Sequence, residues 1–562
     1  MAGTILTPTS IWKDFSVEKD FNEQIVSGTN DEDYSIRDIF INGRTVGEER
    51  VQIFGKLVKS EKAKTKKAIL YVSDLGDSFN LDLLKVIADK GYLVYAVDIC
   101  GKSEFANYTK YPEKIAYANY EVVKENLYKV ENDAKSTCWY EWSVALRYAL
   151  AFLKSMPDIK KVGAFAVGES ATAMWQVAGM DKELDCAVFA LNTGWTGYRG
   201  IDKFAGQVEP QFSDEMFKYI AGIDPQSYAQ HITCPTLILV ATNSNYYDCD
   251  RAYDTVSHMK EEIYSAVNYS VGYIDTISEN AFNSAMIFFD SNMGTKTSSL
   301  PVYIDTKIEC VDGKIIVTAI CKDKNVKMVD AYVCEQTTRS AIRCWHKLTD
   351  WKLNDKTGEY MFEYAPYFES EIVMSFVQIT FKNGYSIGSN IVAKRFNKEE
   401  VALSYKSKLI YSSREKNSES VFTSADQKGQ RLININSDKR NIVEVKKGPM
   451  GMEGVSCENG LLTFKINATT DKPQDDAMLM FDIYAKESGA MQVKLVCDYF
   501  GEKVEYINNV SLLGDEVWQN VQIEINKFKT EQGISLKSYE KVEAIEFICD
   551  HNKFLINNAL WV

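Results

Sequence analysis

The segment around Ser170 holds the residues best suited to chemistry. An apolar, β-rich run at 162–167 leads into the residues GESAT at 168–172, and a helix-forming run continues to residue 180. A serine in a tight turn between a strand and a helix is typical of a nucleophile elbow, where small neighbours allow the sharp bend. Thr172 stands where this pattern usually has glycine. The sequence therefore predicts that Ser170 occupies the position of a nucleophile; the alternative is that it only caps the helix.

A serine hydroxyl is a weak nucleophile at neutral pH and needs a base, which an acidic side chain orients. Behind such an elbow, the acid and then the base are expected later in the chain. Asp248 or Asp250 follows an apolar run at 235–241 and could supply the acid. The base is expected after the last strand, near 269–273, but the position there is taken by Asp275 and not by histidine.

Histidine is scarce throughout the chain. The four histidines are His231, His258, His346 and His551. His231 precedes the run at 235–241, so we expect it at the edge of the sheet opposite the site. His258 falls in a helix-forming stretch, and the other two lie in later parts of the chain. The sequence therefore predicts a serine without an imidazole, next to one expected oxyanion donor, the backbone N–H of Ala171.

Strand and helix signals alternate over residues 1–297, which we interpret as an α/β fold with a mostly parallel, doubly wound sheet. The expected strands are 68–72, 92–97, 162–167, 186–191 and 235–241, and the expected helices are 79–90, 139–155 and 171–180. Trp139, Trp142, Leu146, Leu150 and Leu153 share one face of the second helix, as a helix packed on a sheet requires.

Two all-β regions are expected after this one. Short strand-like runs separated by turns fill residues 298–396 and predict an immunoglobulin-like β-sandwich. The remainder, 397–562, opens with a polar linker and then predicts a jelly roll, a second sandwich.

The charge and cysteine content limit the partners and cofactors that we expect. The 562 residues carry 64 Lys and Arg against 78 Asp and Glu, a net charge of −14, which argues against nucleic acid or an anionic membrane as a partner. The twelve cysteines include no Cys-x-x-Cys pair, so we expect free thiols, no metal and no cofactor. No secretory signal or membrane-spanning run is readable, so the expected location is cytoplasmic.

Much of residues 5–290 resembles bacterial acetylxylan-esterase-like proteins of the α/β-hydrolase superfamily. The resemblance rests on 6–15, on 91–98, on the elbow, and on 223–229 leading into 232–235 and 241–243. It implies an α/β-hydrolase fold and acylated carbohydrate as the substrate class. It also implies that the N–H of Leu75, in the loop SDLGD at 73–77, is the second oxyanion donor.

The chain departs from this family at three places. Relatives usually have Asn-Asp where this chain has Asn243-Ser244, a histidine within 273–276, and a His-Gly-rich loop at 73–77. The middle region resembles the small β-domain of some relatives through Thr338-Arg339 and the residues RCW at 343–345. The last region resembles carbohydrate-binding jelly rolls, through 517–521 and 554–561, although Trp518 and Trp561 could equally be core residues.

Three functions remain open, and the sequence leaves undecided whether the chain is an enzyme. It could be a degenerate esterase that binds a carbohydrate or a protein partner without turnover. It could be an active serine carboxylesterase or deacetylase on acylated carbohydrate, with Ser170 and a carboxylate base such as Asp275 or Glu279. It could be a self-assembling or interaction scaffold, in which case a homo-oligomer is expected.

Overall fold

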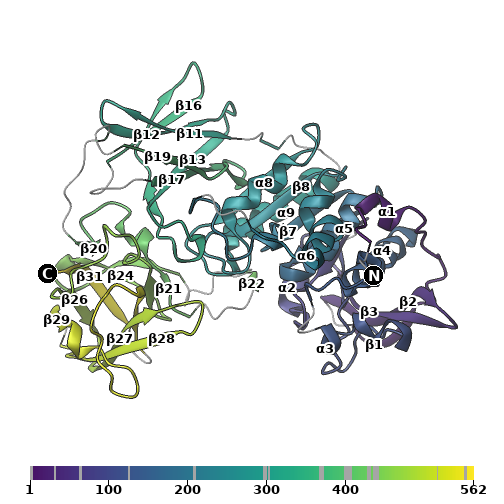
Figure 1. The fold of residues 1–562 in the computed structure, drawn as a ribbon, viewed down its shortest axis with the longest axis horizontal. Coiled ribbons are helices and arrows are strands. Elements are labelled where there is room, and N and C mark those ends of the chain that lie inside the picture. Colours follow the sequence, from purple (N-terminus) through teal and green to yellow (C-terminus); the bar gives the residue numbers. More distant parts are fainter. Residues whose placement is uncertain are drawn as a thin grey trace.

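Figure 1 shows the computed structural model, with the first half of the chain on the right, the middle region at the top and the C-terminal region at the lower left. The structure describes residues 4–30, 33–62, 66–123, 127–206, 210–294, 300–301, 304–365, 372–397, 401, 408–426, 432–433, 442–515, 517–549 and 553–562. The expected boundary between 297 and 298, and part of the expected linker from 397 onward, lie outside the described residues.

One mixed sheet organises the first half of the chain. Its strands lie in the order β1 (Gln24–Asn30), β2 (Tyr34–Val46), β3 (Glu49–Ser60), β5 (Leu93–Val97), β4 (Lys67–Val72), β6 (Lys161–Val167), β7 (Cys186–Ala190), β8 (Thr236–Ala241) and β9 (Ser265–Ser270). From β5 to β9 neighbours are parallel, while β1, β2 and β3 pair antiparallel. This strand order and pairing confirm the predicted α/β class for this region.

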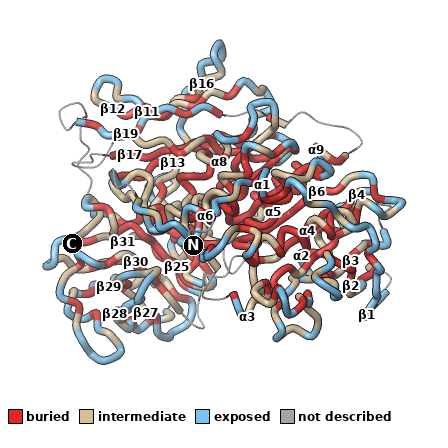
Figure 2. The backbone as a smooth tube through the Cα atoms, turned by 45° about the vertical axis from the view of Figure 1, so that its right-hand side comes forward, coloured by how far each residue is buried: buried red, intermediate tan, exposed pale blue. Residues whose placement is uncertain are grey.

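Helices cover both faces of that sheet. The helices are α1 (Pro8–Trp12), α2 (Leu81–Asp89), α3 (Tyr120–Val123), α4 (Cys138–Ser155), α5 (Ala171–Met180), α6 (Asp214–Gly222), α7 (Pro225–Ala229), α8 (Ala252–Ser257) and α9 (Glu279–Met293). Successive side chains of β4 point to opposite faces, so Leu70 packs with α4 and α5 and Ile69 packs with α2 and α9. Figure 2 shows the buried backbone concentrated in these central elements and the exposed backbone at β1.

The middle region consists of two sets of antiparallel strands, one of which is joined to the first sheet, and the immunoglobulin-like topology stays a prediction. Four strands, β11 (Asp305–Val311), β12 (Lys314–Ile320), β16 (Glu359–Tyr364) and β15 (Trp351–Asn354), make one antiparallel sheet. The others, β13 (Val326–Glu335), β14 (His346–Leu348), β17 (Ile372–Phe381), β18 (Ser386–Gly388) and β19 (Val392–Arg395), continue the first sheet, because β18 pairs with β9 at Gly388 and Val267. Gly388 is required there, since a Cβ would lie 2.3 Å from the ring of Tyr269.

The C-terminal region consists of two antiparallel sheets around a common core. One contains β20 (Leu409–Ser412), β23 (Glu444–Lys447), β24 (Glu453–Ser456), β26 (Met478–Ala485), β29 (Gln519–Glu524) and β31 (Phe554–Trp561). The other contains β21 (Thr423–Ser424), β25 (Leu461–Thr463), β27 (Gly489–Cys497), β28 (Val504–Leu512) and β30 (Val542–Ile548). Trp561 is buried in the core, and the Trp518 indole donates to the Pro449 carbonyl. The jelly-roll topology stays a prediction.

A short pair of parallel strands joins the first region of the chain to the C-terminal region. The strand β10 (Thr276–Ile277), in the loop after β9, pairs with β22 (Leu432–Ile433).

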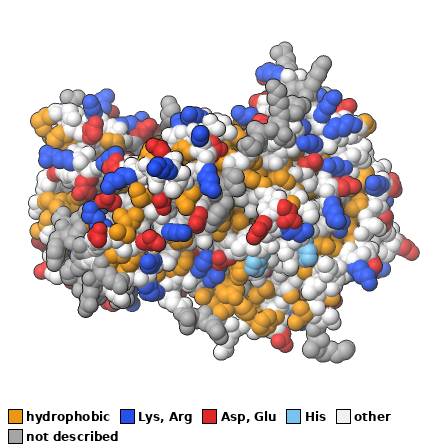
Figure 3. Space-filling model, turned by 90° about the horizontal axis from the view of Figure 1, so that it is seen from above, with side chains coloured by type: hydrophobic (Ala, Val, Ile, Leu, Met, Phe, Trp, Pro, Cys, Tyr) orange, Lys and Arg blue, Asp and Glu red, His pale blue; other side chains and the backbone are white. Residues whose placement is uncertain are grey.

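The surface seen in Figure 3 mixes acidic and basic side chains, so this face presents no continuous basic area. Among the described helices, none is both long and apolar enough to cross a membrane.

Candidate functional site

The sharp turn after β6 is made by Gly168 and not by Ser170. Gly168 has φ +60°, in the left-handed region that favours glycine. Ser170 has φ −57° and ψ −27°, ordinary helical values, and only 1% of its surface is exposed. The prediction that Ser170 lies at the tip of the turn is therefore wrong: glycine tolerates the bend, and the serine has already entered the helix.

The predicted donor Ala171 is also occupied. Its N–H donates to the carbonyls of Glu169 and Gly168, within the first helical turn. It is therefore directed into the helix and not toward a reaction centre.

The Asp74 carboxylate gathers the two N–H groups that converge at the turn. Its Oδ1 accepts from the N–H of Leu75 at 2.8 Å and from the N–H of Glu169 at 2.8 Å. In α/β-hydrolases, the oxyanion hole has two donors: the backbone N–H of the residue after the nucleophile and an N–H from the loop that follows a neighbouring strand. A Cβ on Gly168 would lie 2.3 Å from the same Oδ1. The Asp74 carboxylate thus already accepts from the N–H of Leu75, the second donor that the resemblance implies, and from that of Glu169.

The next residue, Glu169, is buried in a polar cluster. Its carboxylate accepts from the hydroxyls of Tyr128 at 2.7 Å and Tyr247 at 2.6 Å and forms an ion pair with Arg199 at 2.9 Å. Burial alone would lower the pKa of Arg199, but the charge of Glu169 raises it instead. The guanidinium therefore stays charged and fixes Glu169 in place.

The two predicted carboxylates lie elsewhere. Asp275 is buried, with φ +45°, in the loop between β9 and β10. Asp248 lies at the start of a short 3-10 turn, Cys249–Arg251, and its Oδ1 accepts from the Asp250 N–H at 3.0 Å. Burial, reinforced by the charge of Asp250 and opposed by Arg343, raises the pKa of Asp248 to about 7. No hydrogen bond in the described part of the chain joins Ser170 to either residue.

Asp250 is tied to the middle region. Both of its carboxylate oxygens accept from the Arg343 guanidinium, at 2.7 and 2.9 Å, and both side chains are 0% exposed. The ligand atoms of Asp248, Cys249 and Asp250 lie within 4.8 Å of one another, close enough for a metal ion. Because the guanidinium already neutralises Asp250, the group has little charge left for a cation.

No described histidine takes the place of the missing base beside Ser170. None of His231, His258 and His346 hydrogen bonds to it. His258 lies against the ring of Trp195, with the ring centres 5.7 Å apart. His551 lies outside the described residues.

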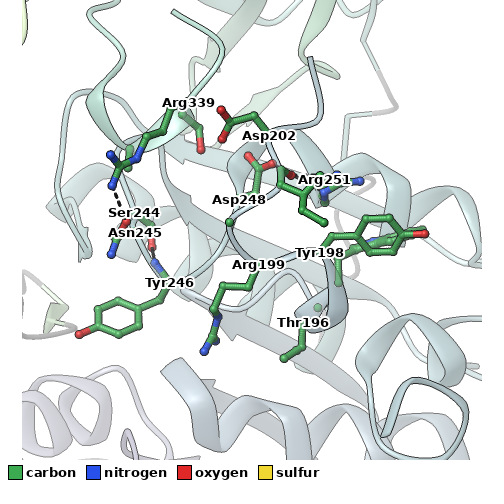
Figure 4. Close-up of a pocket in the computed structure, with 16 residues that line it drawn as sticks. Thr196, Tyr198, Arg199, Asp202, Ser244, Asn245, Tyr246, Asp248, Arg251 and Arg339 are labelled. Atoms are coloured by element: carbon green, nitrogen blue, oxygen red, sulfur yellow. Dashed lines mark hydrogen bonds and ion pairs between the residues drawn. The ribbon is translucent and has the colours of Figure 1, made fainter. Parts of the chain in front are cut away.

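An open cavity of about 70 Å³ lies near this filled turn. It is formed by the loop 194–202 after β7, the loop 244–251 after β8, and residues 339–341 of the middle region. Figure 4 shows Asp202 and Asp248 between Arg251 and Arg339; the Arg339 guanidinium lies beside Asn245, and Arg199 and Tyr246 extend away from the two aspartates. Sequence reasoning missed Arg199, Asp202 and Arg251, and it noted Arg339 only as part of a family signature.

Asn243 fastens the middle region over this edge of the sheet. Its Nδ2 donates to the carbonyls of Ala341 at 3.2 Å and Arg343 at 2.8 Å. The segment that the resemblance associates with a catalytic acid thus serves here as an anchor.

No family model matches the chain, and no curated protein matches it either. Among solved structures, the chain is similar to an acetyl xylan esterase from Paenibacillus sp. R4, with 14% identity and TM-score 0.38 over 51% of this chain and 92% of that one. It is similar to acetyl xylan esterase 1 from Thermoanaerobacterium sp. JW/SL YS485, with 14% identity and TM-score 0.36 over 51% and 95%. It is also similar to a glucuronoyl esterase from Solibacter usitatus, with 10% identity and TM-score 0.36 over 51% and 91%. These identities and scores are too low to support a statement about activity.

Proposed function

We propose that this chain is an α/β-hydrolase-fold protein that no longer hydrolyses esters and instead binds a ligand of the carbohydrate class. The observation that carries this proposal is the occupied turn. Gly168 offers no side chain at the bend, and the Asp74 carboxylate accepts from the two N–H groups that an oxyanion would need.

The filled hole opposes ester hydrolysis in two ways. A serine at residue 168 would bring its Cβ to 2.3 Å from the Asp74 Oδ1, too close for any real pair of atoms. A tetrahedral intermediate would also place its negative charge beside a carboxylate, where an active enzyme supplies donors. In this interpretation the pattern small-x-nucleophile-x-small is read as Ala166, Gly168 and Ser170, two residues earlier than the sequence suggested.

Ser170 does not replace the nucleophile that is missing at residue 168. Its hydroxyl is buried at the first turn of α5, and no described carboxylate or imidazole is bonded to it to accept its proton. The active-esterase alternative, with Asp275 or Glu279 as the base, is therefore not the function we propose.

Binding is supported by the cavity that remains. Polar groups of both kinds line it, with Arg251 and Arg339 as donors, Asp202 and Asp248 as acceptors, and aromatic rings beside them. Hydroxyl-rich ligands are held by such sets of polar groups placed next to apolar surface. The carbohydrate class itself comes from the sequence resemblance. A scaffold role and a homo-oligomer stay predictions.

Hydrolysis is tested with a fluorophosphonate probe and with p-nitrophenyl acetate on the full chain. We expect no labelling and no rate above that of the buffer, for the wild type and for Ser170→Ala alike. Strong labelling that disappears in Ser170→Ala would contradict the proposal. Binding is tested separately, by calorimetry with xylo-oligosaccharides, and the absence of heat with all of them removes the carbohydrate class.

A further inference from the structure

We infer that the cavity between the loops 194–202 and 244–251 receives a carboxylate group of the ligand, with Arg251 and Arg339 as its cationic partners. This inference rests on the proposed binding function and adds the charge of the ligand to it. At about 70 Å³ the cavity is several times larger than the roughly 10–15 Å³ that one water needs, yet well below the roughly 300–1,000 Å³ of pockets that enclose whole ligands. It therefore fits an end group of a ligand.

Arg251 is a buried cation with unused hydrogen-bonding capacity. Only 8% of its surface is exposed, and its Nη2 donates to the Ile201 carbonyl at 3.2 Å. Its Nε is buried and has no hydrogen-bond partner among the described residues. The nearest carboxylates, Asp248 at 3.7 Å and Asp254 at 3.9 Å, form ion pairs beyond hydrogen-bond distance. A guanidinium has five N–H donors, and among the described residues this one has a single hydrogen-bond acceptor, the Ile201 carbonyl.

The plane of this guanidinium is fixed by aromatic rings. Its central carbon lies 4.6 Å from the centre of the Tyr198 ring and 5.8 Å from that of Trp195. A held, planar donor matches a planar carboxylate through paired hydrogen bonds, which is why arginine serves such sites better than lysine.

Arg339 approaches the same cavity from the middle region and is loosely held. Its contacts are long, 3.5 Å to the Glu543 Oε1 and 3.4 Å to the Asn245 Oδ1. Typical N–H···O distances are about 2.9 Å, so a ligand carboxylate can replace these contacts at little loss. About a third of the side chain, 36%, is exposed, which leaves it free to turn.

The acidic side chains of the cavity select for a single negative charge. Burial raises the pKa of Asp248 to about 7, with Asp250 adding to the rise and Arg343 and Arg251 opposing it. Burial likewise raises the pKa of Asp202, against Arg343 and Arg339. Below about pH 7 the Asp248 carboxyl carries a proton that it can donate to the ligand. A phosphate dianion would meet more repulsion from Asp202 than a carboxylate does.

The test compares D-gluconate with sorbitol, which has the same carbon chain but a hydroxymethyl group in place of the carboxylate. Acetate and inorganic phosphate serve as further probes, and binding is measured by calorimetry on the full chain at about pH 6 and about pH 8. We expect gluconate to bind at least about tenfold more tightly than sorbitol, phosphate to bind more weakly, and gluconate to bind better at the lower pH.

The variants Arg339→Gln and Arg251→Gln should each lose about tenfold in gluconate affinity and clearly less in sorbitol affinity, because only gluconate loses a charge partner. Arg414→Gln, at an exposed arginine far along the chain, is the matched control and should change neither. Arg251→Lys keeps the charge if Arg251→Gln fails to fold. Equal affinity for gluconate and sorbitol overturns the carboxylate inference but leaves the binding function standing. No binding of any carboxylate overturns it as well, whereas ester hydrolysis in the separate assay overturns the proposed function.

Discussion

Two places at the carboxyl edge of the sheet have opposite characters. At the turn after β6 the converging backbone N–H groups are satisfied within the protein, because Asp74 accepts from both. In the nearby cavity, Arg251 keeps a buried nitrogen without a hydrogen-bond partner among the described residues. The two places therefore differ in whether the described part of the protein satisfies their hydrogen-bonding groups. The middle region takes part in this, because Arg339 and Ala341 line the cavity while the turn after β6 involves the first region alone.

The largest effect should come from breaking the pair that holds the cavity wall. Arg343→Leu leaves the Asp250 carboxylate buried without its counter-charge, and we expect a loss of about 3–5 kcal/mol in the free energy of unfolding. Urea denaturation followed by fluorescence measures it. Lys314→Leu, which removes an exposed partner of Glu363, is the control and should change stability by about 0.5 kcal/mol or less. Equal losses in the two variants would mean that the pair at the cavity is not special.

The next effect concerns the charge of Asp248. Its folded pKa, about 7, lies above the usual value near 3.9, so the native state binds the proton more tightly than the unfolded chain. The stability that this proton contributes is present at low pH and is lost as the pH rises from about 4 to about 7, by at most about 4 kcal/mol. Asp248→Asn should flatten this part of the stability profile, measured by urea denaturation at several pH values. Parallel profiles for variant and wild type would contradict the raised pKa.

A smaller effect should appear at the filled turn. Gly168→Ala adds a Cβ into the Asp74 carboxylate and imposes a positive φ on alanine, and we expect a loss of about 1–3 kcal/mol. Gly91→Ala is the matched control, because Gly91 has φ +90° and no described atom near the new Cβ. Adding Asp74→Ala should recover the part of the loss caused by the clash, as a double-mutant cycle shows. If Gly168→Ala costs no more than Gly91→Ala, the hole is not filled as described.

The smallest effect should come from Ser170 itself. Ser170→Ala removes a buried hydroxyl that takes no part in a catalytic hydrogen bond, so we expect less than about 1 kcal/mol in stability and no change in esterase assays. Thermal denaturation and p-nitrophenyl acetate hydrolysis measure the two quantities. A measurable rate of hydrolysis in the wild type that is lost in this variant would contradict the view that the turn after β6 is inactive.

Much of the central fold could be predicted from local patterns. The expected helix 139–155 matches α4, where the Thr137 side chain accepts from the Tyr140 N–H, and the expected strand 162–167 matches β6 to within one residue. The helix-forming stretch that was expected to include His258 is shorter, because α8 ends at Ser257, one residue before it. The N-terminal strands β1 to β3 were not predicted, because β1 is exposed throughout and lacks the alternation that marks a half-buried strand.

The site was harder to predict, since its decisive features depend on contacts between distant residues. The letters GES at 168–170 do not say which residue bends, although glycine is the one that takes a positive φ without strain. That Asp74 reaches the N–H of Glu169, 95 residues later, cannot be read from either segment alone. The same holds for Arg343 and Asp250, which lie 93 residues apart in regions that the sequence divides into separate domains.

The junction at β9 has a consequence for how this protein can be divided. Side chains as well as backbone fasten the middle region to β9: the amide of Asn268 donates to the Ser386 carbonyl of β18, and the Gln378 side chain of β17 bonds both backbone groups of Tyr269. A fragment ending near residue 294 would leave those groups without partners along β9, at the edge of the central sheet. Unpaired strand edges pair with other chains and promote aggregation. The hydrolase-like half should therefore be prone to aggregation when produced alone, and the later residues act as its permanent cover.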